Sequence, residues 1–85
     1  MLEMEAPFDI EYEGLPARVS EHELQEMRIF RIIFTGPRKP LVITVAEKPG
    51  GKKWWTSVPQ GRQKEAEEVG RLIADYIRAK RKEKG

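Results

Sequence analysis

Hydrophobic and polar residues alternate along the first two thirds of the chain in a way typical of β-strands. Phe8, Ile10 and Tyr12 are separated by single acidic residues, and this period of two gives a strand one buried and one wet face. The segment 27–35 is richest in β-branched and aromatic residues and predicts the strongest strand. Segment 17–24, with its acidic side chains, predicts an edge strand. We expect strands at 8–13, 17–24, 27–35, 41–46 and 52–56.

Glycine and proline separate these predicted strands. Turn residues occur at 14–16, at 36–40 and at 48–51, and loops this short predict that neighbouring strands pair in sequence order. The run Gly50-Gly51-Lys52-Lys53 looks like a phosphate-binding loop, but it precedes a strand instead of a helix. A hairpin turn is the favoured interpretation.

The last third of the chain changes to a helical period. The residues of one helical stripe are Ala66, Val69, Ile73, Tyr76, Ile77 and Lys80, with Leu72 at its margin. Ser57-Val58-Pro59-Gln60 matches a capping box, so we predict a helix over 58–81. At 1.5 Å per residue this helix is roughly 35 Å long, and its basic end should project or fray. Gly70 costs up to ~1 kcal/mol in mid-helix, which predicts a close contact with a bulky sheet residue.

These elements predict an α+β fold of two layers, an antiparallel meander of about five strands followed by one long C-terminal helix. The chain is one domain, residues 1–85, with a flexible N-terminus at 1–6, the meander at 7–57, the helix at 58–81 and a frayed basic tail at 82–85. Because one helix covers one sheet face, the other face should be bare, and it is also partly apolar.

Side-chain parity divides the predicted strands between the two faces. The expected helix-covered residues are Phe30, Ile32, Phe34, Leu41, Ile43, Val45 and one tryptophan. The expected outer residues are Ile29, Arg31, Ile33, Val42, Thr44, Lys53 and the other tryptophan. Adjacent strand residues point to opposite faces, and we predict that Trp55 lies outside.

Composition adds two constraints. The chain has 85 residues and no cysteine, so neither a disulfide nor a thiolate zinc site supports its small core, and self-association is one alternative route to stability. No apolar run approaches the ~18 residues that span a bilayer. We expect a cytoplasmic protein, with a bacterial or archaeal source guessed from its compactness.

The net charge of +2 conceals an asymmetry along the chain. Residues 1–26 carry eight acids and one base, whereas residues 27–60 carry seven bases and one acid. Pairing of acidic with basic strands would cancel most of this field, and we favour that interpretation. The alternative is a basic face that attracts polyanions.

Two partners fit a bare, partly apolar sheet face that carries bases. A second copy of the chain is favoured, and single-stranded nucleic acid stacking on an aromatic residue is the leading specific ligand. The candidate nucleic-acid-binding residues are Arg28, Arg31, Arg38, Lys39, Lys52, Lys53 and Trp55. A weaker anion site is predicted at the helix start, where Arg62 would act with free amides.

No enzyme, metal or cofactor site is predicted. His22 is the only histidine, and its neighbours Glu21 and Glu23 would point to the opposite face of a strand. Glu65, Glu67 and Glu68 suit a solvated helix start better than a metal site. We therefore expect a non-enzymatic binding module, or a structural or protein-interaction homodimer with no nucleic-acid role.

The chain carries two resemblances to known families. Trp54-Trp55-Thr-Ser-Val-Pro-Gln-Gly-Arg-Gln, followed by Val69-Gly-Arg-Leu-Ile, resembles a segment of a family of small uncharacterised bacterial proteins, and this resemblance implies no activity. The order of elements over residues 8–80 is similar to the purine-rich-element-binding (PUR) repeat. That second resemblance implies dimers that bind single-stranded nucleic acid, and it involves no shared sequence motif.

Overall fold

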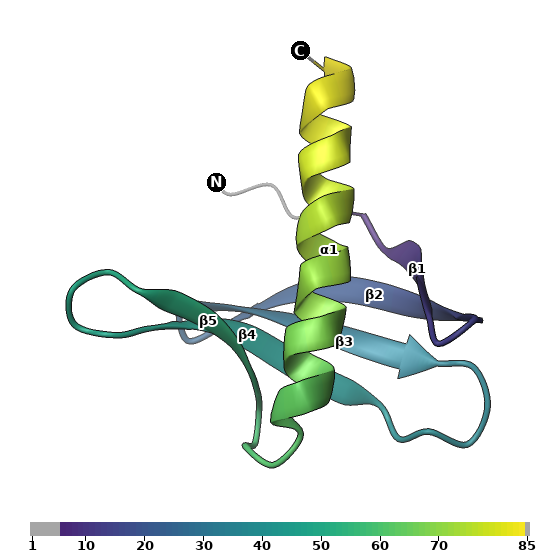
Figure 1. Cartoon of the computed structure of the whole chain (residues 1–85), viewed down its shortest axis with the longest axis horizontal. Coiled ribbons are helices and arrows are strands. Elements are labelled where there is room, and N and C mark those ends of the chain that lie inside the picture. Colours follow the sequence, from purple (N-terminus) through teal and green to yellow (C-terminus); the bar gives the residue numbers. More distant parts are fainter. Residues whose placement is uncertain (1–5, 85) are drawn as a thin grey trace.

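The computed structural model describes residues 6–84 and shows a five-stranded antiparallel sheet followed by one helix (Figure 1). Each strand pairs with its neighbours in sequence, in the order β1-β2-β3-β4-β5. This confirms the predicted α+β meander. Predictions for residues 1–5 and 85 lie outside the described residues. The elements are β1 Phe8–Tyr12, β2 Leu15–Leu24, β3 Met27–Phe34, β4 Leu41–Glu47, β5 Lys53–Ser57 and α1 Gln63–Lys84.

Strand β2 differs from its prediction in length and position. The turn before it needs only Glu13 and Gly14, both at positive φ, so Leu15 and Pro16 already belong to the strand. Residues 15 and 16 of β2 pair with β1 alone, residues 17–19 pair with both β1 and β3, and residues 20–24 pair with β3 alone. The prediction of an edge strand is therefore wrong for β2 as a whole. Its polar signal reflects the half that extends past β1.

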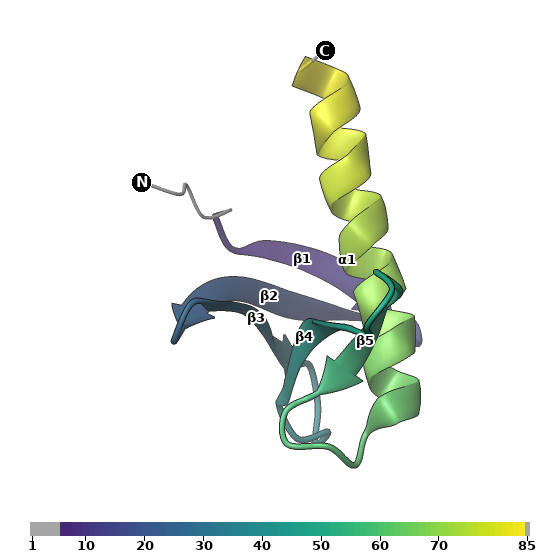
Figure 2. The same cartoon turned by 90° about the vertical axis from the view of Figure 1, so that its left-hand side faces the viewer.

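Helix α1 packs on one face of the sheet, and none of the other described elements lies on the opposite side (Figure 2). The aromatic ring of Tyr76 stacks on that of Phe8 with the centroids 3.9 Å apart, which joins the later turns of α1 to β1. The predicted helical stripe is confirmed, because its first three members are completely buried. The buried core residues are Phe8, Ile10, Tyr12, Ala17, Val19, Phe30, Ile32, Leu41, Ile43, Ala66, Val69 and Ile73.

The two tryptophans occupy the opposite positions to those predicted. Trp55 lies opposite Val45 in the β4–β5 pairing and points toward α1, while Trp54 lies opposite Ala46. Lys53 lies two residues before Trp55 in β5, so its side chain points to the same face of the sheet, and the outer placement predicted for both residues is wrong. Because the two tryptophans are adjacent and identical, the sequence does not indicate which of them faces the helix.

Gly70 is the residue that receives Trp55. A Cβ added at Gly70 would lie 2.5 Å from Cδ1 of the Trp55 indole and closer still to Cγ and Cδ2. Real Cβ atoms do not approach other atoms this closely, so only glycine fits here without a rearrangement. The close contact predicted for Gly70 is confirmed, and its partner is the indole.

The helix begins later and ends later than predicted. Ser57 ends β5, residues 58–62 form a loop, and the Ser57 Oγ accepts a hydrogen bond from the Arg62 backbone N–H at 3.0 Å. The capping box and the helix start at 58 are therefore wrong, because the chain needs those residues to pass from the sheet onto its face. Residues 82–84 are helical, which corrects the frayed tail. The C-terminal end extends beyond the sheet, as predicted (Figure 1).

Candidate functional site

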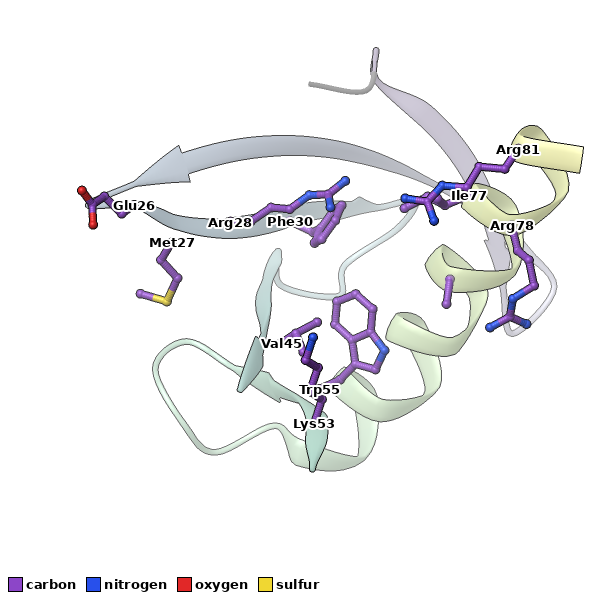
Figure 3. Close-up of a pocket in the computed structure, with 11 residues that line it drawn as sticks. Glu26, Met27, Arg28, Phe30, Val45, Lys53, Trp55, Ile77, Arg78 and Arg81 are labelled. Atoms are coloured by element: carbon purple, nitrogen blue, oxygen red, sulfur yellow. The ribbon is translucent and has the colours of Figure 1, made fainter. Parts of the chain in front are cut away.

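The helix leaves part of its own sheet face uncovered. A cleft of about 570 Å³ lies between the C-terminal half of α1, the start of β3 and the β4–β5 hairpin, and we call it the helix-side cleft (Figure 3). Its apolar walls come from Phe30, Val45, Trp55 and Ile77. Val45 is 43% exposed here although it belongs to the helix-side face, because α1 crosses the sheet without reaching it.

The aromatic wall of the helix-side cleft is fixed by packing. The rings of Phe30 and Trp55 meet edge to face, with centroids 5.6 Å apart and planes at 63°. Gly70 of α1 packs against the Trp55 indole, and the Arg28 guanidinium lies 5.3 Å from the Phe30 ring centroid. Contacts on several sides hold both rings in place before any ligand arrives, which lowers the entropy lost on binding.

Positive side chains line the helix-side cleft as well. Arg28, Lys53, Arg78 and Arg81 line the helix-side cleft together with a single carboxylate, Glu26 (Figure 3). Among residues 6–82, neither Lys53 nor Arg81 has an ion-pair partner. These two cations are therefore available to an anionic ligand.

The other two cations of the cleft are partly neutralised by the protein. The Arg28 Nε contacts the Glu21 carboxylate, whose side chain is only 4% exposed, while the Arg28 side chain is 53% exposed. Arg78 faces Asp75 at 3.5 Å, in an exposed i,i+3 pair of the kind that contributes little energy. Both guanidinium groups keep donors for a further partner, because each has five N–H groups.

The structure brings together only part of the predicted nucleic-acid-binding set. Arg28, Lys53 and Trp55 line the helix-side cleft. Of the rest, Arg31 points to the other face of the sheet, and Lys39 lies in the β3–β4 loop. The lining of the cleft also lacks Lys52, Arg38 and Arg62.

Sequence reasoning missed Arg78 and Arg81, because a basic run at the end of a helix is typical of a solvated tail. Ala74 and Ile77 line the helix-side cleft beside them, and residues three and four apart share a helix face. That spacing was the available signal for both arginines.

Arg38 and Arg62 are held by an ionic network at the start of α1. Arg38 pairs with Glu13 and Glu65, and its guanidinium lies 5.2 Å from the Tyr12 ring centroid. Arg62 donates to the Glu65 carboxylate at 2.7 Å and to the backbone carbonyls of Pro40 and Lys39. The chain's own Glu65 thus occupies the position where an anion was predicted to meet Arg62. Neither arginine contributes to the helix-side cleft.

Two pKa values are shifted in this network. The hydrogen bond from Arg62, followed by that from Arg38, lowers the pKa of Glu65 from 4.5 to about 2, against the opposing effect of burial. Burial raises the pKa of Tyr12 to about 12, and its hydrogen bond to Glu68 at 2.6 Å adds to the rise. The network therefore joins the start of α1 to β1 and to the β3–β4 loop.

The single histidine of the sequence, His22, lies in strand β2. His22 is exposed and its Nε2 lies 3.0 Å from the Ser20 Oγ. Among the described residues, no three histidine or carboxylate side chains are grouped to hold a metal ion. Within residues 6–84, α1 lacks the long apolar stretch that a membrane-crossing helix requires.

Comparison with family models, curated proteins and solved structures finds no match to this chain. The two resemblances drawn from the sequence accordingly stay predictions.

Proposed function

We propose that this protein is a non-enzymatic module that binds single-stranded nucleic acid in the helix-side cleft. The observation that supports it is that four cationic side chains, those of Arg28, Lys53, Arg78 and Arg81, line the same cleft as the aromatic ring of Trp55. This places the site on the side of the sheet that faces α1, whereas the sequence alone suggested the other face.

The two kinds of side chain suit the two parts of a nucleotide. Phosphate groups supply most of the affinity for a polyanion, and cations at the rim can meet them. Unpaired bases are free to stack on aromatic rings, whereas the bases of a duplex are already stacked inside it. The cleft is open along the exposed Val45 side, so a flexible strand can enter from solvent. A single strand is therefore the preferred form.

Binding of labelled oligonucleotides, measured by fluorescence anisotropy over a series of salt concentrations, tests the proposal. Lys53→Ala and Arg81→Ala should each weaken binding and each reduce the slope of log affinity against log salt by about 0.7, the value for one phosphate contact on a single strand. These two residues are the best choices, because neither forms an ion pair with any of residues 6–82 whose loss would disturb the fold.

Lys39→Ala is the matched control. Lys39 is an exposed lysine that was also predicted to bind, but it lies in the β3–β4 loop and does not line the helix-side cleft. This loop and the β4–β5 hairpin lie at opposite ends of the sheet (Figure 1). Its replacement should leave both affinity and salt slope unchanged. The proposal is wrong if the parent protein shows no affinity at low salt. It also fails if Lys39→Ala weakens binding as much as Lys53→Ala does.

A homodimer without a nucleic-acid role is the second candidate, and the other sheet surface favours it. We call this surface the far face; its apolar side chains come from Ile29, Ile33, Val42 and Trp54. Ile33 is 42% exposed, and no other element within residues 6–84 covers it (Figure 2). Arg31 lies among them, as the sequence predicted, so the far face is only partly apolar. A two-fold axis would pair this surface with itself.

Light scattering tests the second candidate independently of nucleic acid. The chain has a mass of 9.9 kDa, so a dimer has twice that mass. Ile33→Asp would place an unpaired charge in such an interface and should convert a dimer into monomers. A parent protein that remains monomeric at all accessible concentrations removes this candidate.

A further inference from the structure

We infer that a bound strand continues from the helix-side cleft around the tip of the β4–β5 hairpin to a second aromatic site at Trp54. This inference rests on the proposed function and extends its footprint. The two tryptophans point to opposite faces of β5, which is an edge strand of the sheet, so a nucleic-acid strand that contacts both has to pass around the end or the free edge of the β4–β5 hairpin.

The second site is an open hollow of about 340 Å³ beside Trp54. Lys48 and Lys52 line it from the hairpin, and the Lys48 Nζ lies 5.3 Å from the centroid of the Trp54 ring. A nucleotide here would find a flat ring for its base and two ammonium groups for its phosphate. This combination of an aromatic ring and cations is the one seen in the helix-side cleft.

The hairpin tip between the two sites carries little that would obstruct a strand. Gly50 and Gly51 form it, both at positive φ, and a Cβ placed on either would meet no atom within 4 Å. The Lys48 backbone N–H donates to the Lys52 carbonyl at 2.7 Å, so the turn is closed by its own hydrogen bonds. Because Gly50 and Gly51 carry no side chains, a phosphate backbone can pass close to the protein main chain at these two residues, which follow Pro49 in the turn.

Three lysines mark the route around this tip. Lys53 faces the helix-side cleft, Lys52 follows at the turn, and Lys48 stands beside Trp54. No ion pair involves any of the three among residues 6–82. A polyanion following this route would meet a cation at each stage.

One carboxylate opposes the charge of the second site. Glu67 lines the hollow and accepts a hydrogen bond from the Gln63 side-chain amide at 2.9 Å. The same amide donates to the Trp55 carbonyl at 2.7 Å, so Gln63 holds the carboxylate close to the exposed edge of β5. Two lysines against one carboxylate leave the hollow positive, but less so than the helix-side cleft. The cleft should therefore fill first.

Affinity measured against oligonucleotide length tests the route. In the parent protein, affinity for oligothymidylate should rise with length beyond the shortest oligomer that binds, by about tenfold, as expected for one additional stacked base. The double variant Lys48→Ala/Lys52→Ala should bind that shortest oligomer as the parent does and should lose the rise with length. Lys39→Ala is again the control and should retain the rise.

Tryptophan fluorescence gives a second readout. Long oligomers should quench more emission in the parent than in Trp54→Phe, whereas the shortest oligomer should quench both proteins equally. If the shortest oligomer binds but the double variant keeps the full rise with length, the route around the hairpin is wrong while the cleft proposal stands. If no oligomer binds the parent protein at low salt, the proposed function itself has failed.

Discussion

Replacing Gly70 with alanine adds one methyl group at the closest contact between helix and sheet. That carbon would lie 2.5 Å from Cδ1 of Trp55, and less from two other indole atoms, so the ring has to move. The opposing effect is helix propensity, which favours alanine over glycine by about 1 kcal/mol. Overpacking in a core costs about 1–3 kcal/mol, and complete loss of a buried Phe or Trp side chain, which sets an upper limit for displacing the indole, costs about 3–5 kcal/mol.

The clash outweighs the propensity gain because the nearest atoms belong to a rigid ring held against Phe30. We expect Gly70→Ala to lower the free energy of unfolding by about 1–2 kcal/mol, which corresponds to a fall in Tm of about 4–16 °C for a domain of this size. Gly70→Leu should be more severe. Thermal and urea unfolding followed by circular dichroism measure both changes.

A double-mutant cycle separates the clash from other effects. In a Trp55→Leu background the added methyl group has room, so Gly70→Ala should be neutral or stabilising by up to about 1 kcal/mol. Ala79→Gly, at an exposed position of α1, reports the propensity difference alone. An unchanged or higher Tm for Gly70→Ala in the parent background would refute the close-packing argument.

Three further predictions concern the ionic network at the start of α1. The pKa of Glu65 in the folded protein lies below its ordinary value, so its contribution to the free energy of unfolding is present above about pH 4.5 and is lost as the pH falls toward about 2. Glu65→Gln should remove this pH-dependent contribution, about 1–2 kcal/mol after allowance for the exposed partners of Glu65. Urea titrations at several pH values measure it. Tyr12 has a raised pKa, so its contribution is lost as the pH rises from about 10 through about 12, and Tyr12→Phe should remove one late tyrosinate transition from an alkaline absorbance titration. Arg38→Ala should lower Tm without changing oligonucleotide affinity, and a loss of affinity at unchanged Tm would contradict its structural role.

The sequence predicted the fold because each local signal agreed with the tertiary arrangement. Alternation in β1, turn residues between strands and a helical stripe beginning at Ala66 all pointed to the same meander and helix. The predicted helix start was wrong because Ser57 and Pro59 satisfy a local capping pattern, whereas five residues connect the end of β5 to the start of α1, which packs on the face of the sheet. Such a connection depends on where α1 packs, and local sequence does not encode that distance.

The candidate site was harder to predict than the fold. Which tryptophan faces the helix depends on the register of β5 against β4, and two identical adjacent residues leave that register open. Gly70 carried the missing information, since a glycine in the stripe requires one large partner. The contribution of Arg78 and Arg81 depends on where the C-terminal half of α1 lies relative to β3 and the β4–β5 hairpin, because the cleft is formed between these elements.

Trp55 belongs to both the hydrophobic core and the wall of the helix-side cleft. The two roles cannot be changed separately: a smaller ring at position 55 would both reshape the wall of the helix-side cleft and loosen the core, while a larger residue at position 70 would push the indole out toward solvent. Related sequences should therefore keep Trp55 and Gly70 together. They should vary instead in the cations at the margin of the cleft, where the ligand preference proposed above can change without destabilising the fold.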